Sequence, residues 1–210
     1  MRRVQWALLA TAGLCTIGFI VLALCAQAGL LAGFDNSGLW AARSVETAKL
    51  DAIVPNLTNV GEAAYIAAVA IVIGAIFAVR RDWARAALVV AGVGGAEVLN
   101  IVLKHIADRT RPELWTHLVN ETSQSFPSGH ATASAALALC IVAIAWYSRW
   151  RIAAIVGAIM YVAVVAFTRL YLGVHYPSDI LAGWLCAAAW VSLVIALIVM
   201  WRTRQSSKLD

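Results

Sequence analysis

The stretch that decides the fold is Ile180–Met200, ILAGWLCAAAWVSLVIALIVM, which contains no charged residue. A helix that crosses a bilayer needs about 20 predominantly apolar residues, so this stretch has the length and composition of a transmembrane helix. Five further apolar stretches precede it in the chain. The six expected spans cover residues 4–31, 60–79, 86–103, 131–147, 152–167 and 180–200. The sequence therefore predicts an all-α, polytopic membrane protein with six transmembrane helices.

The composition supports a membrane protein and excludes other classes. Apolar residues make up 62% of the chain and charged residues 13%, whereas soluble domains carry about 25% charged residues. No basic run is long enough to predict a nucleic-acid partner. The four cysteines lie in apolar stretches without CxxC spacing, which indicates apolar packing rather than disulfides or metal ligands. We expect one membrane-embedded domain that spans residues 1–210.

The first span has an alternative interpretation as a cleavable signal peptide. Arg2 and Arg3, the apolar run and the triplet Ala26–Ala28 fit the pattern of such a peptide. The apolar run, however, exceeds the roughly 7–15 residues of a signal-peptide core. The sequence therefore favours an uncleaved first span.

Lysine and arginine positions predict the orientation, because cytoplasmic loops are enriched in these residues. With a cytoplasmic N-terminus, the inner set is Arg2, Arg3, Arg80, Arg81, Arg85, Arg149, Arg151, Arg202, Arg204 and Lys208. The outer set is Arg43, Lys49, Lys104, Arg109, Arg111 and Arg169. We expect a multi-pass protein of the cell (inner or plasma) membrane with both termini in the cytoplasm.

The segment Asp35–Pro55 follows the first span and has two interpretations. Asp35, Asn36 or Ser37 could cap a helix. Apolar and charged residues then alternate as in an amphipathic helix on the outer membrane surface, over about residues 36–54. The alternative is an ordinary surface loop, and the sequence does not decide between them.

Polar residues concentrate in three motifs, all on the predicted outer face. The first runs from Lys104 to Pro112. Lys104 and Arg111 are seven residues apart, so on a continuing helix both would face the same way. Two converging cations suit a phosphate, although cations at a span end also extend to the interface without any ligand.

The second motif is Phe126–His130, FPSGH, which opens the fourth span. Ser128 can cap the helix, and Gly129 lets the backbone approach a ligand closely. Free N–H groups at a helix N-terminus bind anions. His130 would then lie beside a bound anion, although a lone histidine at a span end is more often structural.

The third motif contains Arg169, His175 and Asp179. A carboxylate near an imidazole fixes its tautomer and stabilises its cation, as a nucleophilic histidine requires. The alternative is that Asp179 only caps a helix and His175 is an unrelated loop residue.

Together the motifs resemble the three-part signature of the type 2 phosphatidic acid phosphatase family. The ten matching residues are Lys104, Arg111, Pro112, Pro127, Ser128, Gly129, His130, Arg169, His175 and Asp179. Thr168 departs from the serine that is usual in the family. The resemblance covers the chain from Lys104 to Asp179 by motif and most of the rest through its six-span pattern.

The resemblance implies a phosphatase that needs no metal or other cofactor. His175 would attack phosphorus and form a phosphohistidine, with Asp179 orienting it. His130 would protonate the leaving group and then activate water. Lys104, Arg111 and Arg169 would hold the phosphate oxygens, with backbone N–H groups around Ser128 and Gly129. This places a helical-bundle active site at the extracytoplasmic end.

A phosphorylated lipid is the expected partner. Phosphatidic acid, phosphatidylglycerophosphate and undecaprenyl diphosphate are the substrates that the family resemblance offers. A lipid phosphotransferase with the same histidine and a non-enzymatic lipid carrier are the alternatives. Trp115 and the segment 35–55 are the expected walls of a headgroup entrance, and Glu97 either supports the site or bonds within the bundle. The sequence does not indicate the oligomeric state.

Overall fold

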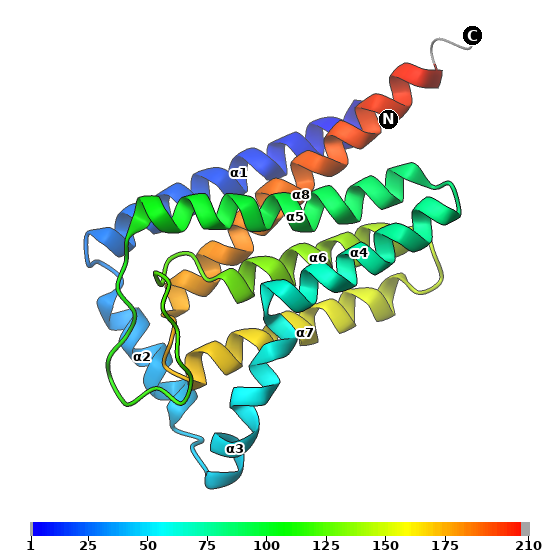
Figure 1. The fold of residues 1–210 in the computed structure, drawn as a ribbon. Coiled ribbons are helices and arrows are strands. Elements are labelled where there is room, and N and C mark those ends of the chain that lie inside the picture. Colours follow the sequence, from blue (N-terminus) through cyan, green and yellow to red (C-terminus); the bar gives the residue numbers. More distant parts are fainter. Residues whose placement is uncertain (1, 207–210) are drawn as a thin grey trace.

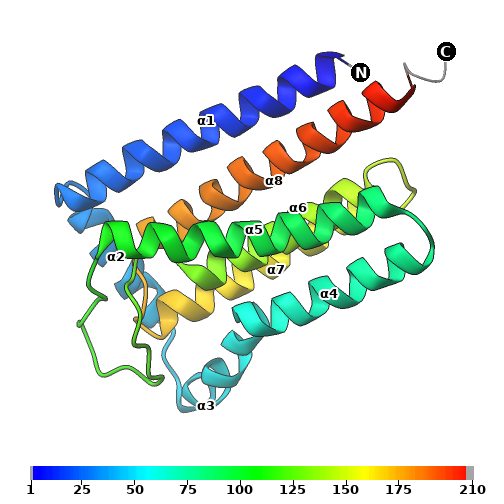
Figure 2. The same cartoon turned by 45° about the horizontal axis from the view of Figure 1, so that its top comes forward.

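The computed structural model describes residues 2–206, and all regular structure in them is helical (Figure 1). Long helices lie side by side and form a bundle (Figures 1 and 2). They are α1 (Arg2–Gln27), α4 (Ala63–Val79), α5 (Trp83–Ala107), α6 (Gly129–Ala145), α7 (Arg151–Tyr171) and α8 (Pro177–Ser206). The shorter helices α2 (Ala32–Arg43), α3 (Ala48–Leu57) and the 3₁₀ helix η1 (Thr58–Gly61) lie at one end of it.

Within residues 2–206, four helices are each long and apolar enough to cross a membrane, namely α1, α5, α7 and α8. A fifth span results if the segment Ala48–Gly61 and α4, which meet at an angle of 44°, are counted as one broken span. The apolar helix α6 is shorter, with 17 residues. The chain is therefore an all-helical, multi-pass membrane protein, and the count of six spans stays a prediction.

The helix ends differ from the expected span ends in a consistent way. α5 continues past residue 103 to Ala107, α7 continues past 167 to Tyr171, and α8 begins at Pro177 rather than at 180. Hydropathy ends a span at the first polar residues, whereas hydrogen bonding continues the helix through them. The polar motif residues Lys104, Arg169 and Asp179 are therefore held on rigid helical turns.

The sequence left one amphipathic helix over 36–54 or a surface loop open, and neither matches the structure, because this segment forms parts of two helices. α2 begins at Ala32, so Asp35 lies inside its first turn and caps nothing. Thr47 has an extended backbone, and its hydroxyl accepts the N–H of Leu50 at 3.2 Å, which starts α3 as a new helix. The Thr47 N-cap divides the segment, and the alternation of apolar and charged residues does not reveal this break.

α6 lies at the centre of the bundle, in contact with α4, α5, α7 and α8. The half of α6 nearest its N-terminus is buried and made mostly of small residues, including Ala131, Ala133, Ala135 and Ala136. Small side chains let helix backbones approach closely without a bulky residue between them. As a result, the polar ends of α5, α6, α7 and α8 converge at one end of the bundle.

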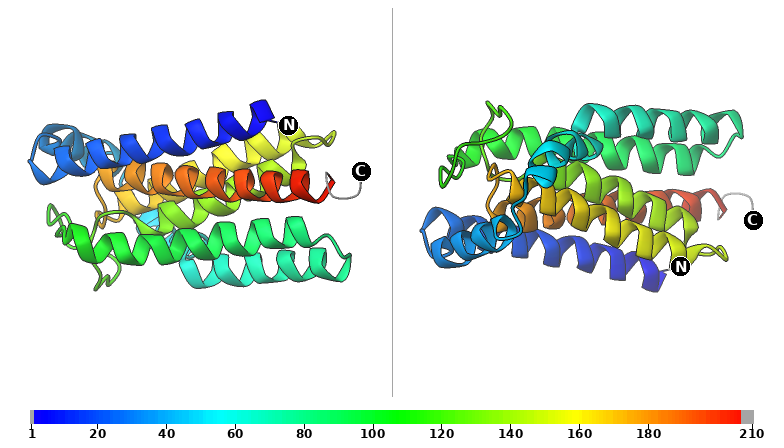
Figure 3. Two further views of the ribbon diagram at one scale, coloured as in Figure 1. Left: turned by 90° about the horizontal axis from the view of Figure 1, so that it is seen from above. Right: turned by 90° about the horizontal axis from the view of Figure 1, so that it is seen from below.

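The two ends of the bundle are different in structure. The N-terminal end of α1 and the C-terminal end of α8 lie together, and the amide Nε2 of Gln5 donates to the hydroxyl of Thr203 at 3.4 Å (Figure 3). The opposite end carries α2, α3 and the irregular segment 108–128 (Figure 1). Lys208, which belongs to the predicted inner set, lies outside the described residues.

Candidate active site

A polar cavity of about 290 Å³ lies at the end of the bundle that carries the segment 108–128. Five of the eight predicted site residues line it, namely Lys104, Arg111, Gly129, His130 and His175. The other lining residues are Glu62, Ala63, Glu97, Asn100, Ile101, His105, Glu121, Ser123 and Gln124. Residues from three separate motifs therefore share one cavity, as the sequence predicted.

Lys104 and Arg111 converge, although by a different route from the one expected. α5 ends at Ala107, and Asp108 adopts a left-handed backbone with φ 43°, so no helix continues to Arg111. The segment beyond it folds back over the cavity. The ammonium Nζ of Lys104 donates to the hydroxyl of Ser123 at 2.9 Å, and Nη2 of Arg111 donates to the same oxygen at 3.2 Å.

Arg169 completes the cation cluster from the last turn of α7, with only 1% of the residue exposed. Its Nη1 donates to the hydroxyl of Thr58 at 3.0 Å, and its Nη2 pairs with the carboxylate of Glu121. The other oxygen of Glu121 accepts from Nη2 of Arg111 at 3.2 Å. Glu121 therefore bridges two of the three predicted phosphate-binding cations.

The charge state of Glu121 follows from this setting. Burial disfavours its ionised form, but the guanidinium groups of Arg169 and Arg111 outweigh burial and lower the pKa of Glu121 to about 2. The cluster therefore already binds an anion, the side chain of Glu121, at neutral pH.

His175 lies in the connection between α7 and α8 and is 1% exposed. Its Nε2 lies 3.1 Å from Nη1 of Arg111. A guanidinium is only a donor, so Nε2 must be the acceptor, and this assigns the proton to Nδ1. Burial, and then the charges of Arg169 and Arg111, hold the pKa of His175 well below its usual value. The imidazole is therefore neutral, and its Nε2 lone pair is directed at the guanidinium of Arg111.

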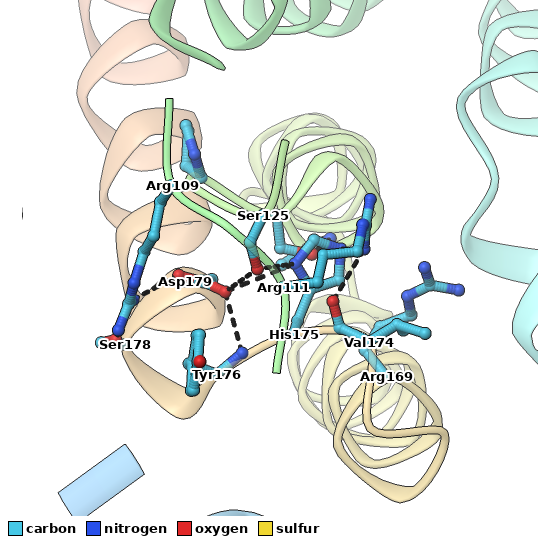
Figure 4. A network of polar contacts seen from close by, with 12 residues as sticks. Arg109, Arg111, Ser125, Arg169, Val174, His175, Tyr176, Ser178 and Asp179 are labelled. Atoms are coloured by element: carbon cyan, nitrogen blue, oxygen red, sulfur yellow. Dashed lines mark hydrogen bonds and ion pairs between the residues drawn. The ribbon is translucent and has the colours of Figure 1, made fainter. Parts of the chain in front are cut away.

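The Nδ1 side of His175 faces Asp179, in the first turn of α8 (Figure 4). The distance from Nδ1 to Oδ2 of Asp179 is 3.5 Å. Ser125 lies between them, because its hydroxyl donates to Oδ2 at 2.5 Å and lies 3.4 Å from Nδ1. The same Oδ2 accepts the backbone N–H of Tyr176 at 2.8 Å. The predicted His–Asp pair is thus close in space, with a serine that the sequence did not suggest.

His130, Gly129 and Ser128 open α6, and they differ in what they offer the cavity. Nε2 of His130 lies 3.4 Å from Nη1 of Arg169. The hydroxyl of Ser128 accepts the backbone N–H of Ala131 at 3.4 Å. The backbone N–H of Ser128 donates to the backbone carbonyl of Asp179 at 3.0 Å. The backbone N–H of Ser128 is therefore not free for a phosphate, whereas Gly129 lies at the cavity wall.

Several polar residues of this region carried no recognisable signal in the sequence. Glu121 and Ser125 lie in an irregular segment without periodicity, and Arg109 and Asp35 meet near Asp179 only through the fold. Glu97 lines the cavity, and its Oε2 is buried without a hydrogen-bond partner. Neither Trp115 nor any residue of 35–55, the expected entrance walls, lines the cavity itself. Trp115 instead packs against Trp40, with ring centroids 5.4 Å apart.

Comparison with known proteins shows similarity to PAP2 proteins. The PAP2 superfamily model matches residues 85–203. Phosphatidylglycerophosphatase B of Bacillus subtilis is 29% identical over 172 residues, which cover 79% of this chain and 83% of the relative. Undecaprenyl-diphosphatase of Sulfolobus acidocaldarius is 35% identical over 106 residues, 47% of this chain and 48% of that one.

Among solved structures, the chain is similar to a transmembrane PAP2-type phosphatidylglycerolphosphate phosphatase from Bacillus subtilis. The TM-score is 0.80 at 26% identity, and the match covers 89% of this chain and 95% of that chain.

Proposed function

The chain belongs to the PAP2 superfamily, and from this premise we propose that it is a lipid phosphatase in which Nε2 of His175 attacks phosphorus. Relatives named for phosphatidylglycerophosphate and for undecaprenyl diphosphate support lipid phosphate esters and diphosphates as the substrate class. Phosphatidic acid is a third substrate of the same chemistry. Residues 1–210 act as one membrane-embedded domain in this proposal.

The observation that carries the proposal is the arrangement of hydrogen-bonding groups around His175. Its Nε2 accepts from a guanidinium 3.1 Å away, and its Nδ1 faces the carboxylate of Asp179 and the hydroxyl of Ser125. A nucleophilic imidazole needs this tautomer, with an unprotonated nitrogen toward the substrate and an acceptor behind the N–H. A histidine with a purely structural role needs no cations around its lone pair.

In the proposed reaction, the Nε2 lone pair forms a bond to phosphorus, and the bond from phosphorus to the leaving oxygen breaks. The negative charge of the bound phosphate favours a protonated His130, which gives a proton to that oxygen. Water then attacks phosphorus, the bond from phosphorus to Nε2 of His175 breaks, and neutral His130 takes up a proton from the water. Inorganic phosphate leaves, and both histidines return to their starting states. Asp179 stabilises the positive charge that develops on His175.

The cations at the cavity stabilise the phosphoryl oxygens. Phosphoryl transfer gains mainly from positioning and from neutralising charge on these oxygens. Lys104, Arg111 and Arg169 supply three positive charges, and Gly129 lets the backbone come close. The substrate phosphate takes the place of the Glu121 carboxylate between Arg111 and Arg169, because both anions need the same donors. These cations do for the phosphate what a metal ion would do, so we propose metal-independent hydrolysis.

The site faces the extracytoplasmic side in this proposal. The cavity lies at the end of the bundle opposite to the paired ends of α1 and α8. The arginines of the turns that connect α4 to α5 and α6 to α7 lie at that opposite end as well. Enrichment of arginine on the cytoplasmic side supports this orientation.

Phosphate release tests the proposal directly. Purified protein in detergent with EDTA is given phosphatidic acid or undecaprenyl diphosphate, as wild type and as His175→Ala. We expect release by the wild type, loss of release in the variant, and a ratio of rates that ranks the two lipids. Release that survives in His175→Ala would refute the nucleophile, and a strict need for divalent ions would refute metal independence. A folded wild type that releases no phosphate from either lipid would contradict the proposal as a whole.

A further inference from the structure

Asp35, on α2, is a fully buried carboxylate beside the start of α8. Its Oδ1 accepts the backbone N–H of Ser178 at 3.0 Å, and its Oδ2 accepts the hydroxyl of Ser178 at 2.8 Å. Oδ2 also accepts Nη2 of Arg109 at 2.7 Å. A buried carboxylate is costly unless it is paired and hydrogen-bonded. Both partners of Asp35 are next to Asp179, because Ser178 precedes it in the chain and Arg109 is bonded to it.

Arg109 joins Asp35 to the site. Its Nη1 donates to Oδ1 of Asp179 at 2.6 Å and to the hydroxyl of Ser178 at 2.8 Å (Figure 4). The guanidinium lies over the ring of Tyr176, 4.1 Å from the centroid. Arg109 therefore donates to one carboxylate with each terminal nitrogen and does not form a bidentate pair with Asp179. This leaves Oδ2 of Asp179 to Ser125, to the Tyr176 N–H and to His175.

We propose that Asp35 and Arg109 are positioning residues that fix the orientation and the net charge of the Asp179 carboxylate behind His175. This inference rests on the proposed function, because it concerns the acceptor of the proposed nucleophile. Neither residue lines the cavity, so both act through Asp179.

The charge balance of the three residues explains why two carboxylates share one arginine. Asp179 and Arg109 alone would sum to zero, and the guanidinium would offset much of the attraction between Asp179 and a positive His175. Asp35 draws on the same guanidinium, so the trio of Asp35, Arg109 and Asp179 carries one net negative charge. This net negative charge faces His175, which becomes cationic in the proposed reaction. The attraction between them is large because charge–charge energies are large in a buried setting.

The packing of α2 holds this arrangement in place. A Cβ atom added to Gly38 would lie 2.5 Å from Cγ of Pro177, so only glycine allows α2 to lie this close to the start of α8. The contact brings Asp35 within hydrogen-bond reach of Ser178, next to Asp179. α2 is thereby attached to the proton-accepting side of the site.

Three variants separate a positioning role from a merely structural one. Asp35→Asn is isosteric and leaves Arg109 paired with Asp179 alone. Arg109→Gln leaves two adjacent carboxylates without their cation. The double variant restores one net negative charge. kcat and KM are measured for phosphate release from phosphatidic acid and undecaprenyl diphosphate in detergent micelles, together with the melting temperature of each protein.

For each single variant we expect kcat to fall about 10- to 100-fold, as is typical when partners that orient a reacting group are lost. KM is expected to change by less than about threefold, because the groups that contact the phosphate are unchanged. The double variant is expected to turn over faster than Arg109→Gln, because it restores the single net negative charge beside His175. Val89→Ala, a fully buried site far along α5, controls for lost stability and is expected to keep its kcat.

The outcomes distinguish this inference from the proposed function. Folded Asp35→Asn and Arg109→Gln proteins with kcat within about twofold of the wild type would overturn the inference, as would a change in KM alone. If Arg109→Gln does not fold, the isosteric Asp35→Asn decides. Phosphate release that survives in His175→Ala would instead refute the proposed nucleophile.

Discussion

At the residue scale, the cation cluster has a consequence for ligand binding. Arg111 and Arg169 already share an anion in the Glu121 carboxylate, which stays ionised because its pKa is about 2. In the proposed reaction, the substrate phosphate takes the place of this carboxylate. We expect Glu121→Gln to lower the inhibition constant of inorganic phosphate about 5- to 30-fold, the equivalent of about 1–2 kcal/mol for a partly buried ion pair. Competitive inhibition of lipid hydrolysis is the measurement.

Glu113→Gln is the matched control for this prediction. Glu113 is an exposed residue of the same segment and does not line the cavity, and the substitution removes the same charge. We expect no change in phosphate inhibition. Equal inhibition constants for the wild type and Glu121→Gln would show that phosphate does not compete with this carboxylate.

Individual residues also show which parts of the candidate site were predictable from the sequence. His130, His175 and Arg111 follow from spacing, because their motifs place them at the ends of apolar spans, and the fold brings them to one cavity. Ser125 and Asp35 belong to no periodic pattern. Ser125 bonds to Asp179 across 54 residues of the chain, and Asp35 bonds to Ser178 across 143. Such tertiary contacts leave no local trace. Ser128 illustrates the converse, since the sequence indicated a free N–H that the fold uses elsewhere.

At the scale of elements, the crossing of α6 and α8 determines how the two halves of the site meet. Gly183 on α8 lies against the first turns of α6, and a Cβ atom there would lie 2.8 Å from the carbonyl oxygen of Ser128 and 2.9 Å from Oγ1 of Thr132. The carbonyl oxygen of Ser128 belongs to the backbone, so it cannot move away without shifting the start of α6. The same crossing carries the bond from the Ser128 N–H to the Asp179 carbonyl, at 3.0 Å.

We therefore expect Gly183→Ala to force the helices apart. Overpacking of this kind costs about 1–3 kcal/mol, so the melting temperature in detergent should fall, and kcat should fall with it as His130 and Asp179 move apart. Gly157→Ala on α7 is the control, because a Cβ atom at that position meets nothing within 4 Å. A melting temperature for Gly183→Ala as high as that of Gly157→Ala would mean that this crossing tolerates a methyl group.

Elements were predictable where hydropathy and hydrogen bonding act together. The apolar stretches located every long helix of the bundle, because each must satisfy its backbone internally in lipid. The ends were less predictable, since polar residues such as Lys104 and Arg169 lie inside helical turns. The division of residues 32–57 into α2 and α3 depended on a single capping hydroxyl, that of Thr47.

At the scale of the whole molecule, the bundle separates two chemistries. The cavity end holds buried ion pairs, such as Arg109 with Asp179 at 2.6 Å, and the cation cluster around Glu121. The other end carries arginines in exposed turns, such as Arg81 and Arg149. This asymmetry is the basis for the proposed orientation. The buried arginines are held by ion pairs at the site, whereas exposed arginines in short turns are enriched on the cytoplasmic side.

The orientation can be tested with one cysteine at each end of the bundle. Ser44 is exposed in the turn between α2 and α3, at the cavity end, and Ser148 is exposed in the turn between α6 and α7, at the other end. In intact cells, a membrane-impermeant maleimide is expected to label Ser44→Cys, and to label Ser148→Cys only after the membrane is permeabilised. The unmodified chain is the background control, because its own four cysteines are at least partly buried. Labelling of Ser148→Cys alone in intact cells would place the cavity in the cytoplasm, and the substrate would then have to be a lipid of the inner leaflet.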